Sequence, residues 1–202
     1  CVVSAKPVIS RIGDSHAVAA ISRNAQDLDA CRGSLYQPVN LSEALSTIAE
    51  RNERCFLIGA PCVIRASRRM RTSVVASVKY RAALCCSHNV SSQFVDAIAQ
   101  KEGIRSGESF QVNLRAKNNQ MTDANRFINR FILEDRTIEK ERHQTAFTKM
   151  WRGYFFSLGA CLYCGDFYGA EADISVKDGW GKWTSDPKGV SLIVSKIGRA
   201  HV

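Results

Sequence analysis

The sequence of 202 residues lacks the features that mark several large protein classes. It has no run of about 18 or more consecutive apolar residues, so we expect no membrane span. It contains neither G-x-G-x-x-G nor the phosphate-loop lysine motif, which are the common signatures of nucleotide binding. Its eight cysteines are too few and too irregularly spaced for a disulfide scaffold. We therefore expect a reducing, cytoplasmic compartment in which thiols serve metals or redox chemistry.

The bulk composition is that of a globular protein. Apolar residues make up 45% of the chain and charged residues 23%, and the length favours one domain. The net charge of +9 favours anionic partners such as phosphates, nucleic acid or an acidic protein. The charge is spread along the chain, however, and its densest run, "RASRRMR" at residues 65–71, fits a solvated helix face at least as well as a binding patch.

Both ends of the chain indicate a fragment. Cys1 opens directly into an apolar run without a basic region, so we expect no signal peptide and an internal starting point. The last six residues, "IGRAHV", are what the codons ATC GGA AGA GCA CAC GTC of a common sequencing adapter encode. We expect residues 197–202 to be non-native, which leaves 1–196 as a single domain and removes His201 from consideration.

Strand-like and helix-like segments alternate along the chain, which predicts an α/β fold with a mixed or largely parallel sheet flanked by helices. Capping boxes are predicted at two helix starts, from Asn24 with Asp27 and from Asn40 with Glu43. The helix expected at 91–103 has a serine as its predicted cap and Gly103 as its predicted end. The segment 124–151 has no clear pattern. Strands are expected at residues 1–5, 7–12, 55–60, 80–86, 109–117 and 190–196, and helices at 24–31, 41–52, 61–71 and 91–103.

Four cysteines are placed where an α/β sheet gathers its ligands, beyond the carboxyl ends of the strands. Cys62 follows the apolar run "CFLIGA" on the first turn of a helix, where the helix dipole favours a thiolate. Cys86 ends the apolar run "RAALCC". Cys161 and Cys164 form a C-x-x-C pair in the loop "ACLYCGDFYGAEADISVKDGWG". The sequence thus predicts a metal-cluster loop near the C-terminus.

The spacing does not choose between zinc and a 4Fe–4S cluster, because both accept four thiolates. A thioredoxin-like dithiol is less favoured, since no clear helix starts at Cys161 after a strand. Asp166 or Asp178 is expected to position a ligand or backbone around the loop, unless these carboxylates are merely solvated. The remaining cysteines are interpreted as small buried side chains. These are Cys1, Cys31, Cys55 and Cys85.

Two further features carry weaker signals. "GSLY", residues 33–36, combines a glycine turn, a hydroxyl and an aromatic ring that can cradle a phosphate or stack on a ring, although such loops are mostly simple turns. His88 and His143 are the plausible catalytic imidazoles, but neither lies in a nucleophile motif. We interpret both histidines as structural.

Several segments taken together resemble a known family. "GSLYQPV", "FLIGAPCVIRASRRM", "ALCCSHNVS", "ACLYCGDFYGAEADISVKDGWG" and "GVSLIV" occur in this order, over roughly residues 31–196. They resemble the C-terminal region of the beta subunits of coenzyme F-420 hydrogenases and dehydrogenases. Lys177 departs from the glycine that more often precedes the aspartate of D-x-W-G in that family, and the family's N-terminal cysteine-rich segment is absent.

The resemblance implies an oxidoreductase that passes electrons between FAD, a 4Fe–4S cluster and a substrate such as coenzyme F-420, with ferredoxin or other redox subunits as partners. The alternative is a zinc-stabilised basic binding module without catalytic activity. Nucleic acid is disfavoured because the aromatic residues crowd an acidic loop. The resemblance implies that the cluster ligands are Cys62, Cys86, Cys161 and Cys164. It implies a flavin pocket formed by Gly33, Ser34 and Tyr36, with Gly59, Pro61 and Asn89 beside it.

Overall fold

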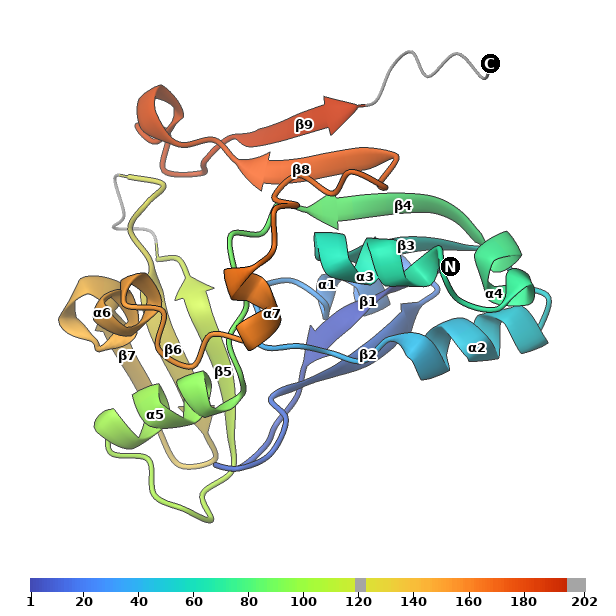
Figure 1. Ribbon diagram of the computed structural model, residues 1–202. Helices are drawn as coiled ribbons and strands as arrows, with labels where there is room; N and C mark the ends of the chain where they lie inside the picture. Colours follow the sequence, from blue (N-terminus) through green and yellow to red (C-terminus); the bar gives the residue numbers. More distant parts are fainter. Residues whose placement is uncertain (119–122, 196–202) are drawn as a thin grey trace.

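The computed structural model describes residues 1–118 and 123–195 and contains two β-sheets (Figure 1). The larger sheet has six strands in the order β2-β1-β3-β4-β8-β9. The four central strands run parallel, while β2 and β9 pair antiparallel at the two edges. The strands are β1 (Val2–Pro7), β2 (Ala17–Ser22), β3 (Cys55–Gly59), β4 (Val78–Leu84), β8 (Ile174–Asp178) and β9 (Ser191–Ser195).

Helices pack against the six-stranded sheet and complete its core. β3 is a continuous apolar run because it lies in the middle of the sheet with both neighbours parallel to it. The side chains of Val3, Leu57, Ile48, Ile64 and Val74 are fully buried in one cluster that joins the strands to the helices. The helices of this half are α1 (Ala25–Asp29), α2 (Ser42–Glu50), α3 (Pro61–Ser67) and α4 (Thr72–Ser77).

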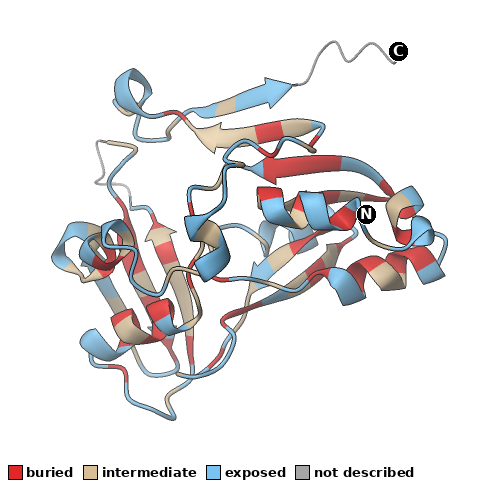
Figure 2. Cartoon of the chain, in the orientation of Figure 1, coloured by how far each residue is buried: buried red, intermediate tan, exposed pale blue. Residues whose placement is uncertain are grey.

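The smaller sheet is a three-stranded antiparallel meander with its own core. It consists of β5 (Phe110–Ala116), β6 (Ile128–Leu133) and β7 (Thr137–Glu141), with α5 (Gln93–Lys101), the short 3-10 helix η1 (Arg142–Gln144) and α6 (Phe147–Arg152). A second cluster of buried residues, including Phe94, Phe110 and Phe131, fills the space between this sheet and its helices. The buried residues form separate zones in the two halves (Figure 2).

The smaller half is inserted into the larger one. The chain leaves the six-stranded sheet after β4 and returns through the short helix α7 (Gly159–Leu162) to β8, which pairs directly with β4. A 3-10 turn, η2 (Gly181–Trp183), then leads toward β9. In Figure 1 the arrowhead of β4 points toward the smaller half, and α7 lies between the two halves. The carboxyl ends of the parallel strands therefore face the region where the chain crosses over.

A buried polar network joins the two halves. Ser10 Oγ lies 2.6 Å from Nδ1 of His16, and Nε2 of His16 lies 2.8 Å from Oδ1 of Asp96 on α5. The His16 backbone N–H also donates to Gln37 at 3.1 Å. All four side chains are buried. Buried polar groups of this kind are stabilising only when satisfied, so the network fixes how the β1–β2 connection lies against the smaller half.

The α/β prediction with a mixed sheet is confirmed, but the strand expected at residues 7–12 is wrong. That segment makes a single bridge, from Ser10 to Phe110, and the strand paired with β1 is Ala17–Ser22. Its sequence, "AVAAIS", is rich in alanine, which is depleted in strands and hides the signal. The unassigned segment 124–151 supplies β6, β7, η1 and most of α6.

The predicted helix ends are partly correct. Asn24 caps α1 as expected, accepting the Asp27 N–H at 2.8 Å, and Gly103 follows α5 with a φ of +85°. The Asn40 capping box is wrong, because Asn40 bonds to Ser42 instead and Leu41 is the cap residue. The serine cap of α5 is also wrong: Ser92 already has helical backbone angles, so its hydroxyl makes no capping bond.

The helix expected at residues 61–71 is shorter in the structure. α3 ends at Ser67, so Arg68 and the following arginine-rich residues lie beyond it. The residues 197–202, predicted to be non-native, lie outside the described residues. Within 1–118 and 123–195, no helix is both long and apolar enough to cross a membrane.

Candidate metal centre

The four predicted cysteines come from three segments beside the six-stranded sheet, one after β3 and two at the ends of the connection from β4 to β8. Cys62 is the second residue of α3, directly after β3. Cys86 follows β4, and its backbone N–H donates to Phe167 O at 3.1 Å, which ties it to the loop after the C-x-x-C pair. Cys161 lies in α7 and Cys164 just beyond it, with the Cys164 N–H bonded to Cys161 O at 3.3 Å.

The four thiols are near enough to affect one another. Burial, and then the charges of Cys62, Cys161, Cys164 and the adjacent Cys85, raise the pKa of Cys86 to about 11. Burial is also the largest cause of the raised pKa of Cys62, and Cys161 and Cys164 add to it. The expectation that the helix start makes Cys62 a thiolate is therefore wrong for the free thiol. α3 is short, and the Val63 N–H that favours the thiolate is outweighed by desolvation.

Cys85 and Cys86 are adjacent but have different surroundings. The Cys85 N–H continues the pairing of β4 by donating to Val176 O at 2.9 Å. Burial raises the pKa of Cys85, and Lys177 opposes this effect, whereas no other cysteine contributes. In contrast, Cys86 is exposed to the charges of Cys62, Cys161 and Cys164. The two adjacent thiols therefore differ, because only the pKa of Cys86 responds to the other three predicted ligands.

The loop after the C-x-x-C pair is held by its own side chains. Asp166 Oδ1 accepts the N–H groups of Gly169 and Ala170 at 2.8 and 2.9 Å, so this carboxylate positions backbone. Gly169 has a φ of +74°, and a Cβ placed there would lie 2.4 Å from Cβ of Ala83 on β4. The loop therefore lies flat against β4 at a position that only glycine fits.

The arginine-rich run beside α3 anchors the same loop. Glu171 lies 3.6 Å from Arg65 and 3.2 Å from Arg69, and Arg68 lies 3.6 Å from Asp173. Arg68 also donates to the backbone carbonyl of Glu171 at 2.8 Å. The run thus links the helix that carries Cys62 to the loop that follows Cys164, rather than forming only a solvated face.

The segment after Cys86 lies against the C-x-x-C segment. The Asn89 N–H donates to Sγ of Cys161 at 3.3 Å, and Sγ of Cys86 donates to the carbonyl of His88 at 3.4 Å. The His88 ring packs in a tilted arrangement against Trp151, with 3.8 Å between centroids, and against Tyr154, with 4.6 Å. Burial lowers the pKa of His88, and its Nε2 is buried without a hydrogen-bond partner in the described structure.

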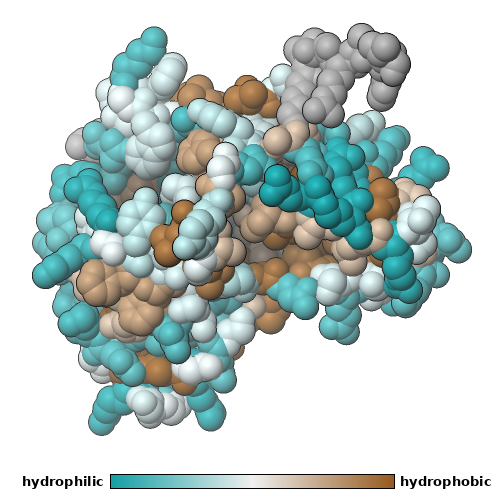
Figure 3. Space-filling view, in the orientation of Figure 1, coloured by the Kyte–Doolittle hydropathy of each residue, from teal (hydrophilic) through white to brown (hydrophobic). Residues whose placement is uncertain are grey.

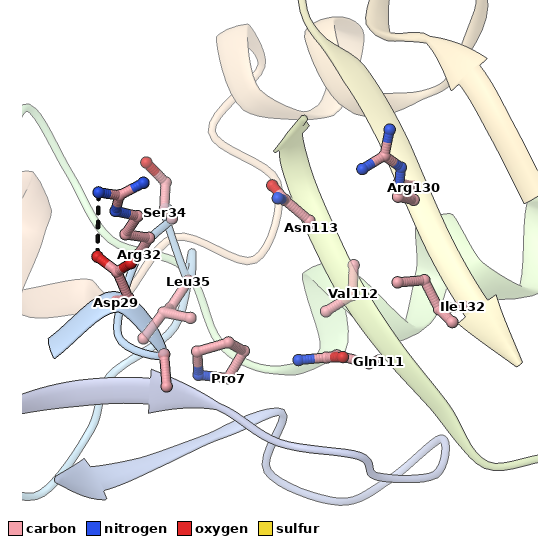
Figure 4. A pocket seen from close by; sticks show the side chains of 12 residues that line it. Pro7, Asp29, Arg32, Ser34, Leu35, Gln111, Val112, Asn113, Arg130 and Ile132 are labelled. Atoms are coloured by element: carbon pink, nitrogen blue, oxygen red, sulfur yellow. Dashed lines mark ion pairs between the residues drawn. The ribbon is translucent and has the colours of Figure 1, made fainter. Parts of the chain in front are cut away.

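Two of the predicted flavin-pocket residues line a cavity between the two halves. This cavity of about 240 Å³ is bordered on one side by Gly33, Ser34 and Leu35, and on the other by β5 and β6 (Figure 4). Its remaining polar side chains come from both halves. They are Asp29, Arg32, Gln111, Asn113 and Arg130.

The other predicted pocket residues lie elsewhere. Tyr36, with a φ of +47°, packs against Phe147 and Trp151, each 5.0 Å away between ring centroids. Gly59 and Pro61 precede Cys62 in the chain, and Asn89 contacts Cys161 as described. The six residues therefore divide between the cavity, an aromatic cluster and the cysteine region.

Two arginines that no motif identifies connect these regions. Arg115 on β5 donates to Ser34 Oγ at 3.3 Å and to Oδ2 of Asp178 at 2.6 Å. Arg142 donates to the Tyr36 hydroxyl at 3.2 Å, and its guanidinium lies 3.9 Å from the centroid of the Phe147 ring. Burial lowers the pKa of Arg142. The partners are 63 to 106 residues apart in sequence, so no local pattern could have revealed them.

The cysteine region lies within a match to a known protein family. The family model for the C terminus of the beta subunit of coenzyme F420 hydrogenase/dehydrogenase matches residues 52–200. The chain belongs to this family. The matched region includes all four predicted cysteine ligands, whereas the loop 33–36 precedes it. The resemblance inferred from the ordered motifs is thus confirmed.

A solved structure has the same fold. It is the xenon-derivatised F420-reducing NiFe hydrogenase complex from Methanosarcina barkeri, one chain of which matches with a TM-score of 0.62 and 16% identity. The match covers 97% of this chain and 62% of that chain, so this chain spans less than two thirds of its structural relative. No curated protein matches the sequence.

Proposed function

We propose that this chain is part of a flavin- and iron–sulfur-dependent oxidoreductase that moves electrons between FAD, a 4Fe–4S cluster and a small-molecule substrate. The leading candidates are a reaction with coenzyme F-420 as the substrate and a ferredoxin-linked reduction. The observation that supports the proposal is that the segment after Cys86 is hydrogen-bonded to the C-x-x-C segment, with Cys62 near enough to raise the pKa of Cys86, in a chain of the F420 hydrogenase/dehydrogenase family.

The donor set fits a cluster. Four thiols are the ligands that a 4Fe–4S cluster requires, and they also suit one zinc ion. Among residues 1–118 and 123–195, no group of three or more histidine, cysteine or acidic side chains is arranged to hold one metal ion. Membership of the F420 hydrogenase/dehydrogenase family supports a redox cluster over the zinc module.

The chain also offers hydrogen bonds to a cluster ligand. The Asn89 N–H already donates to Sγ of Cys161. A hydrogen bond to a ligating sulfur stabilises the more negative, reduced state and raises the reduction potential. The backbone between Cys86 and Asn89 would therefore hold the ligands in place and adjust the potential of the centre.

A flavin fits the region between the two halves. FAD, when bound, supplies two-electron chemistry toward a substrate and one-electron chemistry toward a cluster. Gly33 lines the cavity with a φ of +115° and open space around its Cβ position, so backbone can approach a ligand there. Arg115 holds Ser34 and Asp178 together and would fix the loop against β5. Arg142 would orient the hydroxyl of Tyr36.

The partners follow from the proposed chemistry and the charge. An electron-transfer chain needs a donor or acceptor protein, and ferredoxin or other redox subunits of a larger complex fit this role. The net charge of +9 favours acidic partners and the diphosphate of FAD. We place the protein in the cytoplasm, where thiols stay reduced.

The test is anaerobic purification followed by iron, sulfide and flavin analysis and a visible spectrum. We expect flavin absorption together with broad iron–sulfur absorption. Cys86→Ser should lose iron, whereas Cys85→Ser, at the adjacent position, should keep it. A colourless protein that binds zinc would favour the binding module, and equal iron in both variants would refute the ligand assignment.

A further inference from the structure

The segment that carries the C-x-x-C pair also carries an unusual exposed apolar surface. Of the 18 large hydrophobic residues exposed in the described structure, seven lie within residues 154–168. Isolated exposed hydrophobic residues are normal, but a concentration of them marks an interaction site. We name this set the aromatic surface. It consists of Tyr154, Phe155, Phe156, Leu162, Tyr163, Phe167 and Tyr168.

The aromatic surface lies on the face that holds α7. Figure 3 shows this face, with hydrophobic side chains over α7 between the two halves. Tyr163, between the two cysteines of the pair, is 92% exposed. The surface therefore flanks the C-x-x-C pair, of which Cys164 is itself exposed.

A fixed backbone presents these rings. Tyr154 and Phe156 have φ angles of +57° and +61°, a region unfavourable for bulky residues. The conformation is held by the Ser91 N–H, which donates to Phe156 O at 2.9 Å, and by the Leu158 N–H, which donates to Asn89 O at 3.1 Å. These bonds fix the rings beside the segment that follows Cys86.

The uncompensated charge around the surface is positive. Glu171, Asp173 and Asp178 are each paired with arginines, and Asp166 is bonded to backbone N–H groups. In contrast, the nearby cations have no carboxylate partner in the described structure, although Lys177 lies over the rings of Phe167 and Tyr168. These cations are Lys177 and, on α6 just before Tyr154, Lys149 and Arg152.

We propose that the aromatic surface is the docking site of an acidic one-electron carrier protein of the ferredoxin class. This inference rests on the proposed function, because the carrier would donate one electron to the centre held by the cysteines and leave oxidised by one electron. No bond forms and no proton is transferred in this step. Aromatic anchors ringed by cations are the composition of a protein interface, and opposite charge speeds the encounter.

An anionic membrane is the other surface that aromatic rings and cations could contact. The carrier protein is favoured because the rings surround the C-x-x-C segment, where one-electron exchange requires close approach to the centre. Redox complexes are also typically small and transient, which suits a surface formed by one short segment.

The test uses the purified protein and an acidic clostridial ferredoxin, with binding measured by calorimetry on oxidised ferredoxin. Phe155→Ser with Tyr163→Ser should weaken binding about tenfold or more, because aromatic anchors dominate such interfaces. Lys149→Glu with Arg152→Glu should slow association and reduce its salt dependence. The control is Ile9→Ser, which removes a side chain that is 72% exposed on the β1–β2 connection and should change nothing.

The outcomes separate this inference from the proposed function. Iron and flavin are assayed in every preparation, so a protein that lacks both yet binds ferredoxin through the aromatic surface refutes only the cofactor proposal. The docking proposal is overturned if ferredoxin does not bind, or if the double serine variant binds as tightly as the parent. It is also overturned if the property lost by that variant is binding to phosphatidylserine vesicles.

Discussion

Replacing Gly169 by alanine should destabilise the protein through two effects at one atom. The residue has a φ of +74°, and its new Cβ would lie 2.4 Å from Cβ of Ala83, which is fully buried on β4 and has no side-chain torsion to relieve the clash. Left-handed backbone costs about 1–3 kcal/mol for a residue other than glycine, and overpacking a core position costs about 1–3 kcal/mol. Because two effects at one atom are not fully additive, the expected loss in the free energy of unfolding is about 2–5 kcal/mol.

Equilibrium unfolding in urea measures this loss. With a slope of about 2 kcal/mol per molar urea, the midpoint should fall by roughly 1–2.5 M. Gly165→Ala is the matched control in the same loop, because Gly165 has no atom within 4 Å of its Cβ position and its φ is not positive. If the two alanine variants unfold within about 0.5 kcal/mol of each other, the close contact between the loop and β4 is refuted.

Three further predictions concern the ion pair, the buried network and the thiols. Glu171→Gln should lower the free energy of unfolding in urea by about 0.5–1 kcal/mol. A double-mutant cycle with Arg69→Gln should show a coupling energy that about 1 M salt removes. A coupling energy that does not depend on salt would contradict an ionic origin. Asp96→Ala should cost about 2–4 kcal/mol in the same assay, since it leaves His16 Nε2 buried and unpaired, and a loss near zero would mean that the network does not hold the halves together. In the metal-free protein the pKa of Cys86 is raised from 9.0 to about 11, so the unfolded chain loses this proton first, and stability that is complete below pH 9 should decline as the pH rises toward 11. Cys86→Ala should flatten that decline in a pH series of unfolding curves, and an unchanged slope would rule out the burial of this thiol.

Local patterns predicted much of the larger half. The apolar runs around Leu57 and Ala83, the proline at the start of α3 and the asparagine cap of α1 each report on the few residues beside them, and all appear as expected. β2 was missed because alanine does not signal a strand, and its pairing with β1 is decided by the partner. In the second sheet, β5 agrees with the strand expected at residues 109–117, whereas β6 and β7 are not predicted, and the exposed charged residues of β7 conceal its alternation.

In the candidate site too, positions that depend on neighbouring residues were predictable and contacts between distant residues were not. The position of Cys62 after β3 and of Cys86 after β4 follows from strand order, because parallel strands end at one edge. The roles of Arg115 and Arg142 could not be read from the sequence, since each bonds to residues distant in the chain. The pKa of Cys62 was predicted in the wrong direction because the helix start is visible in the sequence, whereas the burial that opposes it is a property of the packed structure.

The nesting of the smaller half within the larger one has a consequence for evolution and engineering. The chain leaves the six-stranded sheet beside Cys86 and returns beside Cys161, so the residues between these two points form an insertion in the part of the fold that carries the cysteines. Exchanging this insertion between relatives would change the side chains of β5 and β6 that line the cavity between the two halves. The four thiols would keep their positions in the chain. Under the proposed function, new substrate preferences could then arise without rebuilding the proposed metal centre.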